Sequence, residues 1–172
     1  FYRTETDQTS WPQESTSDMV CIAIVYEGRG IRLYRNATLI TEYEIRAPRV
    51  FGKRMHMTLG KRHANRGFFA GEIEEARVYA KALTAQQVAA LAPAPTPDLV
   101  AQAGAPLALW TFEDGTPREE MGFAKQCELH NGAHIQRGRW VLDGVDDFLG
   151  RGFKSLVPRR EAYADTITGQ LE

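Results

Sequence analysis

The chain has 172 residues, of which 43% are hydrophobic and 25% are charged, and its formal net charge is −1. A chain with this composition can bury a core, which excludes global disorder, and its length fits one domain or parts of two. The near-neutral charge argues against a general polyanion binder, and no apolar run approaches the ~20 residues that span a bilayer. We therefore expect no nucleic-acid partner and no membrane span.

The residues up to Pro48 carry the patterns of three consecutive β-strands. Residues 1–18 are polar, and we expect an irregular or edge segment there. Beyond them, apolar or alternating stretches are separated by the turn signals Glu27-Gly28-Arg29-Gly30 and Asn36-Ala37. The predicted strands are Met19–Tyr26, Ile31–Arg35 and Thr38–Ile45.

Residues 49–91 are predicted to add two strands and a short helix. Met55–Gly60 has the character of a strand, and Lys61–Gly67 that of a basic loop. Phe69–Tyr79 is predicted as one long strand with mixed polarity on both faces. Thr84 and Gln87 form a capping box, which predicts a short helix of about two turns over residues 84–91.

The last part of the chain contains several short strand patterns after an Ala/Pro-rich stretch. Residues 92–106 contain four prolines, and we interpret them as a semi-extended linker. The strands that follow are divided by turn signals such as Asn131-Gly132. They are predicted at Leu107–Phe112, Cys127–His130, Ala133–Gln136 and Trp140–Asp143. Many short strands between turn signals indicate an all-β fold.

The tryptophans, cysteines and histidines offer little for catalysis. Trp110, Phe112 and Trp140 alternate along their strands, which is more typical of core than of a ligand platform. Cys21 and Cys127 lie in strand candidates, where each is a buried free thiol or a member of a disulfide. The four histidines are scattered, and no Ser/His/Asp or Cys/His arrangement is evident. We therefore expect no catalytic site within these strands.

Several motifs resemble the laminin-G-like (concanavalin A-like lectin/glucanase) superfamily. The segments Arg32-Leu33-Tyr34-Arg35-Asn36, 71–79 and 82–88 are similar to the closing half of that fold. The segments Trp110-Thr111-Phe112-Glu113-Asp114-Gly115 and 142–148 are similar to its opening half. The resemblance implies a jelly-roll β-sandwich with one short helix after the last strand of the first part.

The two halves occur in reverse order along the chain, which leaves two interpretations of its domains. Residues 1–91 form the C-terminal part of one sandwich and residues 92–106 the linker. Residues 107–152 form either the N-terminal part of a second sandwich or a permuted completion of the first. Residues 153–172 are interpreted as an irregular lead into a following domain. Since the chain begins with Phe1 rather than Met, we expect it to be a segment of a longer protein.

A finer resemblance concerns the arrangement of sandwich, proline-rich linker and Trp-Thr-Phe-Glu-Asp-Gly segment. It is similar to the non-catalytic leader of bacterial family 32 glycoside hydrolases, in which a propeller domain follows. On that resemblance Asp165 is a catalytic candidate, provided that a propeller follows. The resemblances imply an extracellular or periplasmic location.

Three functions follow as hypotheses. The first is a non-catalytic carbohydrate-binding module of a larger secreted bacterial glycan-active protein. The second is a structural spacer or docking module, and the third is the leader of a glycoside hydrolase acting on fructans. The expected partners are a polysaccharide or oligosaccharide and the adjacent domains of the same polypeptide.

A sugar site requires an aromatic ring for the C–H face of the sugar and planar polar groups for its hydroxyls. The candidates lie on strands and on the basic loop, where ligands often bind. They are Trp11, Tyr34, Tyr43, Arg62, His63 and Asn65. The alternative is that the aromatic side chains are ordinary half-buried sheet residues and that the basic loop is solvated.

Calcium is the candidate cofactor, because it is common in the resembled superfamily. A calcium site requires several converging oxygen ligands. Asp143, Asp146 and Asp147 supply carboxylates, together with Glu74 or Glu75. The alternative is a polar turn held by Asx hydrogen bonds over 143–147. Glu74 and Glu75 are adjacent on a predicted strand and point to opposite faces, so they cannot act as an acid–base pair on one sugar.

Overall fold

The computed structural model describes residues 18–48, 59–62, 66–91, 103–123 and 127–150, together with two short strands near the N-terminus. The strands before the helix are β1 (Tyr2–Arg3), β2 (Thr6–Asp7), β3 (Ile22–Glu27), β4 (Gly30–Arg35), β5 (Thr38–Glu44), β6 (Lys61–Arg62), β7 (Arg66–Phe68), β8 (Ala70–Ile73) and β9 (Ala76–Val78). The helix α1 (Ala85–Ala89) precedes β10 (Ala108–Trp110), β11 (Glu128–His130), β12 (His134–Gln136), β13 (Arg139–Asp143) and β14 (Phe148–Gly150). The predicted all-β fold class with a short helix is therefore confirmed.

The chain divides into two compact units, which we describe separately. The first unit takes in the described residues within 1–50 and 81–105, and the second those within 51–80 and 106–164. The first unit thus contains β3, β4, β5 and α1, and the second contains β6 to β14.

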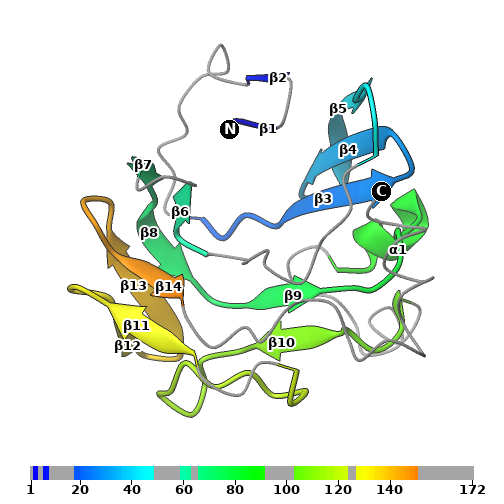
Figure 1. The fold of residues 1–172 in the computed structure, drawn as a ribbon. Helices are drawn as coiled ribbons and strands as arrows, with labels where there is room; N and C mark the ends of the chain where they lie inside the picture. The colour runs from blue at the N-terminus through cyan, green and yellow to red at the C-terminus, as the bar shows by residue number, and fades with distance from the viewer. Residues whose placement is uncertain are drawn as a thin grey trace. The chain divides into compact units, whose positions relative to one another are not determined.

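The first unit is built on an antiparallel meander in which β4 lies between β3 and β5 (Figure 1). Two-residue turns join the strands, since Glu27 pairs with Gly30 and Arg35 pairs with Thr38. Asn36 and Ala37 both adopt positive φ, 46° and 68°, as a tight hairpin turn of this twist requires. The Asn36 side-chain oxygen accepts a hydrogen bond from the backbone N–H of Cys21 at 2.8 Å, which ties the turn to the start of β3.

The central strand β4 is covered on both faces at its middle. Ile31 and Leu33 are buried on one face, and Tyr34, on the other face, is only 3% exposed. The pairing with β5 shifts by one residue at this point, because Leu33 pairs with Thr41 and Tyr34 with Leu39. Ile40 is the extra residue of this β-bulge, and its side chain is exposed.

The helix α1 begins as its sequence predicts. The Thr84 hydroxyl accepts a hydrogen bond from the backbone N–H of Gln87 at 3.2 Å, and the Gln87 side chain accepts one from the N–H of Thr84 at 2.9 Å. This reciprocal capping box satisfies amides that the first helical turn leaves without partners. Val88 is the buried residue of the helix, so the short apolar stripe faces the core.

The second unit joins strands that are distant in sequence. β13 pairs with both β12 and β8, β9 pairs with β10, and β11 pairs with β14. In Figure 1, β8 and β13 lie side by side although one precedes α1 and the other follows it. Residues on both sides of the Ala/Pro-rich stretch therefore share two sheets.

Two sequence predictions in this unit are wrong. The expected basic loop over 61–67 is strand at both of its ends, because Lys61 pairs with Phe68 and Arg62 with Arg66, while residues 63–65 lie outside the described residues. The expected single strand over 69–79 is interrupted at Glu74 and Glu75 and forms β8 and β9, which pair with different partners. Strand periodicity does not show where a strand changes sheets, because that change depends on partners far along the chain.

The core of the second unit is built around two tryptophans, as predicted. Trp110 and Trp140 are fully buried, and the ring centroids of Trp140 and Phe112 lie 5.9 Å apart. Gly60 leaves space for them: a Cβ there would lie 2.4 Å from Leu142 Cδ2 and 3.0 Å from the Trp140 ring. At φ +82°, Gly60 also has a backbone conformation that other residues rarely adopt.

The two cysteines are free and half-buried, in agreement with the free-thiol alternative. Burial raises the pKa of the Cys127 thiol, although the Trp110 indole N–H donates to its sulfur at 3.4 Å. The predicted strand at 55–58, most of the predicted linker and the segment 153–172 lie outside the described residues. Where the structure describes the chain, no helix has the length and apolar character needed to cross a membrane.

Candidate functional site

A polar hollow lies on one face of the meander in the first unit, at the end where β3 turns into β4. Its volume is about 310 Å³. The lining comes from both ends of the turn and from the paired end of β5, namely Glu27, Arg29, Gly30, Arg32, Glu42 and Glu44. The register explains the grouping, because Glu27 pairs with Gly30, Gly30 with Glu44 and Arg32 with Glu42, and directly paired residues share a face.

Ion pairs fix the two arginines of the hollow. Arg32 donates to the Glu27 carboxylate at 2.6 Å, and Arg29 lies 3.1 Å from the Glu44 carboxylate. Arg29 also donates from Nε to the carbonyl of Ile45 at 2.9 Å, while the Ile45 N–H donates to the Arg29 carbonyl at 2.9 Å. The hollow therefore carries both carboxylates and guanidinium groups, which are able to form bidentate hydrogen bonds with paired donors or acceptors.

These residues are not among the candidates predicted from the sequence. Residues 27–30 were interpreted as a turn signal only, without combining the turn with the pairing of the next two strands. The available signal was the recurrence of charged residues at every second position, at Glu42 and Glu44 on β5. A register derived from the two-residue turns would have placed them beside Arg32 and Gly30.

The predicted carbohydrate-binding residues do not converge within the described part of the chain. Tyr34 is buried and has no open ring face for a sugar to stack on. Tyr43 is half-buried on β5, in register with Ile31 rather than with the lining of the hollow. Arg62 lies in β6. Trp11, His63 and Asn65, like the catalytic candidate Asp165, lie outside the described residues.

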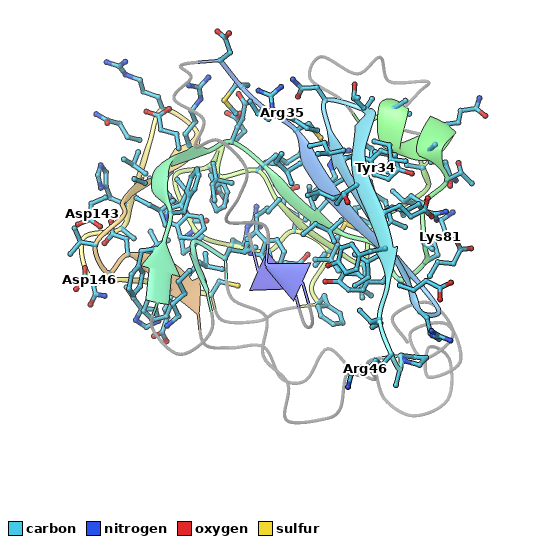
Figure 2. The ribbon with its side chains drawn as sticks, turned by 90° about the horizontal axis from the view of Figure 1, so that it is seen from above. Tyr34, Arg35, Arg46, Lys81, Asp143 and Asp146 are labelled. Carbon is cyan, nitrogen blue, oxygen red and sulfur yellow. The ribbon has the colours of Figure 1, made fainter. Side chains whose placement is uncertain are left out.

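The three aspartates predicted as metal ligands do come together in the turn between β13 and β14. One oxygen from each of Asp143, Asp146 and Asp147 lies within 4.8 Å of the others, and Figure 2 shows Asp143 and Asp146 close together in this turn. Glu74 and Glu75 are paired elsewhere: Glu74 lies 3.6 Å from Arg139, and Glu75 forms an ion pair with Arg77.

The hydrogen bonds of this turn show what Asp147 does. Asp147 is only 2% exposed, and its two oxygens accept from the backbone N–H groups of Gly132 at 2.8 Å and Asp143 at 2.9 Å. Asp143 in turn accepts from the N–H of Val145 at 2.7 Å, which forms an Asx turn. Calcium takes about six to eight oxygen ligands, so the described residues fit a polar turn better than a calcium site.

A second buried carboxylate, Glu119, organises the loop after β10. Its Oε1 accepts from the N–H groups of Leu109 at 2.9 Å and Met121 at 2.7 Å, and its Oε2 accepts from Phe123 at 2.6 Å. Glu119 is 4% exposed, so these three donors replace the water that a buried carboxylate requires. Glu119 and Asp147 are thus structural residues, and sequence reasoning assigned Glu119 no role.

The comparisons with known proteins give one result. A family model described as the concanavalin A-like lectin/glucanases superfamily matches residues 3–89. The matched part includes the meander and every residue that lines the hollow. No curated protein sequence and no solved structure matches the chain, so the comparisons add no support for the finer resemblance to family 32 glycoside hydrolases.

Proposed function

Because the chain belongs to the concanavalin A-like lectin/glucanases superfamily, we propose that it is a non-catalytic carbohydrate-binding module of a larger secreted bacterial protein. The observation that carries the proposal is the polar hollow within the matched residues. Its role is to hold a neighbouring catalytic domain close to a polysaccharide, which raises the effective concentration of substrate.

The chemistry of the hollow suits sugar hydroxyls. A carboxylate accepts two hydrogen bonds from vicinal hydroxyl groups, and a guanidinium donates two in parallel. The volume of about 310 Å³ is at the small end of the range for ligand pockets, ~300 to 1,000 Å³. A site of this size takes a small part of a glycan, such as a chain end, rather than a long segment.

Glycan binding is tested by affinity electrophoresis of the folded chain against a broad panel of soluble polysaccharides. Levan and inulin belong in the panel, because retardation by either would support the fructan hypothesis. The proposal expects retardation by at least one polymer, weakened by Arg32→Ala, which removes a guanidinium from the hollow. A cooperatively folded protein that no glycan retards would refute the proposal.

We propose further that the second half-motif completes the first sandwich in permuted order rather than beginning a separate module. The pairing of β8 with β13 and of β9 with β10 supports this, because each pairing joins residues 70–78 to residues beyond the Ala/Pro-rich stretch. Co-expression of 1–91 and 107–172 as separate chains tests it. The two pieces are expected to copurify, and independent folding of either piece would contradict the permuted arrangement.

A docking module is the second candidate function. Three large apolar side chains on β3 and β5 are exposed by 40% or more, namely Ile22, Leu39 and Ile40. Exposed apolar groups of this kind favour contact with another protein surface. Replacing all three by Thr is expected to abolish association with the adjacent domain if docking is the function, and to leave glycan binding unchanged.

A further inference from the structure

The hollow is lined by more negative than positive side chains. Three glutamates and two arginines face it, which gives the lining a net charge of −1. Both arginines are already paired, Arg32 with Glu27 at 2.6 Å and Arg29 with Glu44 at 3.1 Å. An anionic ligand would have to displace a carboxylate that is held at close distance, so the hollow disfavours anions.

Glu42 is the third carboxylate of the lining, and it belongs to neither of these two ion pairs. It pairs across the strands with Arg32, but the Arg32 guanidinium turns to Glu27 instead. Within the part of the chain that the structure describes, no ion pair or hydrogen bond engages the Glu42 side chain, which is exposed. Since no described residue engages this carboxylate, a ligand that reaches the hollow meets a hydrogen-bond acceptor that it can engage without displacing a partner.

The neighbouring pairs keep Glu42 in this state. Arg32 is the cation in register with it, and Arg29, which also lines the hollow, has Glu44 and the Ile45 carbonyl as partners. For either arginine to neutralise Glu42, it would have to give up a charge-assisted hydrogen bond, which is stronger than one between neutral groups. A cation supplied by the ligand meets no such cost.

We propose that the hollow selects glycans that carry free amino groups over their neutral and anionic counterparts, with the protonated amine placed against Glu42. This inference rests on the proposed carbohydrate-binding function. The hydroxyl groups of the same sugar ring bind the paired carboxylates and guanidinium groups around it. Glu42 is thus the specificity-determining residue, and the two Arg–Glu pairs form the common sugar-binding frame.

The test compares oligomers of glucosamine and of N-acetylglucosamine of the same length, in which acetylation replaces the protonated amine by a larger, neutral amide. Binding of each to the full chain is measured by calorimetry at mildly acidic pH, where the amine of the glucosamine oligomer is protonated. We expect the glucosamine oligomer to bind about three- to five-fold more tightly, as an exposed ion pair allows. The preference should weaken as salt is added.

Two variants assign the preference to its residue. Glu42→Gln is expected to remove the preference for the amine, so that the difference in affinity between the two oligomers disappears. Glu128→Gln, which neutralises an exposed glutamate on β11 in the second unit, is expected to preserve it. Equal affinity for the two oligomers, or a preference that survives Glu42→Gln, would overturn the inference while glycan binding itself stands. Binding of no glycan from any class would refute the proposed function and the inference together.

Discussion

The two units bring their strands together in different ways. In the first unit, β3, β4 and β5 follow one another, and two-residue turns set every pairing. In the second unit, β13 pairs with β8, and the ion pair between Arg139 and Glu72 joins residues 67 positions apart. Turn chemistry therefore determines the meander locally, whereas the second unit depends on contacts between residues that are far apart in the sequence.

Long-range pairing in the second unit orders more chain for each contact, and its loop-closure entropy must be offset before the contacts form fully. The two buried carboxylates of this unit act more locally, because Glu119 and Asp147 accept from five backbone N–H groups that lie at most 15 residues away from them. Surface ion pairs occur in both units and contribute little to stability.

The largest expected effect comes from the core of the second unit. Trp140→Ala removes a fully buried ring that contacts Phe112, and it should lower the free energy of unfolding by about 3–5 kcal/mol. Urea denaturation measures it. Ile22→Ala, at a site 54% exposed in the first unit, is the control and should stay within about 0.5 kcal/mol. If both variants lost a similar amount of unfolding free energy, the proposed difference between the two units would be contradicted.

The next largest loss of stability is expected at the buried carboxylate Glu119, with the exposed Glu120 beside it for comparison. Glu119→Gln keeps the shape of the side chain but sets an amide NH₂ against a backbone donor, and it should cost about 2 kcal/mol. Glu120→Gln is the matched control, since Glu120 is exposed and accepts from the Thr111 hydroxyl. Its expected cost is under about 0.5 kcal/mol. Equal costs would show that the amide contacts of Glu119 do not hold the loop.

A similar pair tests the aspartate turn and its relation to calcium. Asp147→Asn should lower the free energy of unfolding by about 1–2 kcal/mol, because one of its two amide donors loses its acceptor. The exposed Asp146 is the control, and Asp146→Asn should change little. Both measurements are made with a chelator and then with added calcium. A loss that occurs only in the presence of calcium would contradict the structural role and favour a metal site.

In the first unit, one substitution in the turn between β4 and β5 is expected to increase the stability of the fold. Ala37 has φ 68°, which an L-residue adopts at a cost, so Ala37→Gly should raise the free energy of unfolding by about 0.5–1 kcal/mol. Ala37→Val should lower it, because a β-branched side chain is strained at positive φ. A thermal melt of each variant ranks them, and a stabilising Val would contradict the described turn.

The smallest expected effect is a change in Tm that depends on pH. Hydrogen bonds from the Thr116 hydroxyl and N–H, at 2.7 and 2.9 Å, hold the pKa of Asp114 below its usual value. The ionised form therefore adds stability above the unfolded pKa, and this stability is lost as the pH falls through the folded pKa. Asp114→Asn should lower Tm slightly near neutral pH, and the difference should disappear in acid. A difference that is constant with pH would contradict the shift.

Much of the fold could be predicted from the sequence where the signal is local. The capping box of Thr84 and Gln87 locates α1, and the turn at Asn36-Ala37 locates β4 and β5. Trp110 and Trp140 were correctly predicted as core. The interruption at Glu74 and Glu75 was missed, because the change of partner from β13 to β10 leaves no mark on the periodicity of residues 69–79.

The candidate site was less accessible to sequence reasoning, for a related reason. Its residues, such as Arg29 and Glu42, are ordinary surface charges until the register of three strands places them around one hollow. Tyr34 was predicted as a sugar platform from its type, but coverage of both faces of β4 buries its ring. Residue type indicates what a side chain can bind, whereas burial and register decide whether a ligand reaches it.

The most direct test of the account is a titration of the ¹⁵N-labelled chain with the glycan that binds it best, followed by amide chemical shifts. We predict that the largest shifts lie at the ends of β3, β4 and β5, at Arg29, Arg32, Glu42 and Glu44. Shifts confined to the second unit, for instance around the aspartate turn, would contradict the placement of the binding site in the hollow.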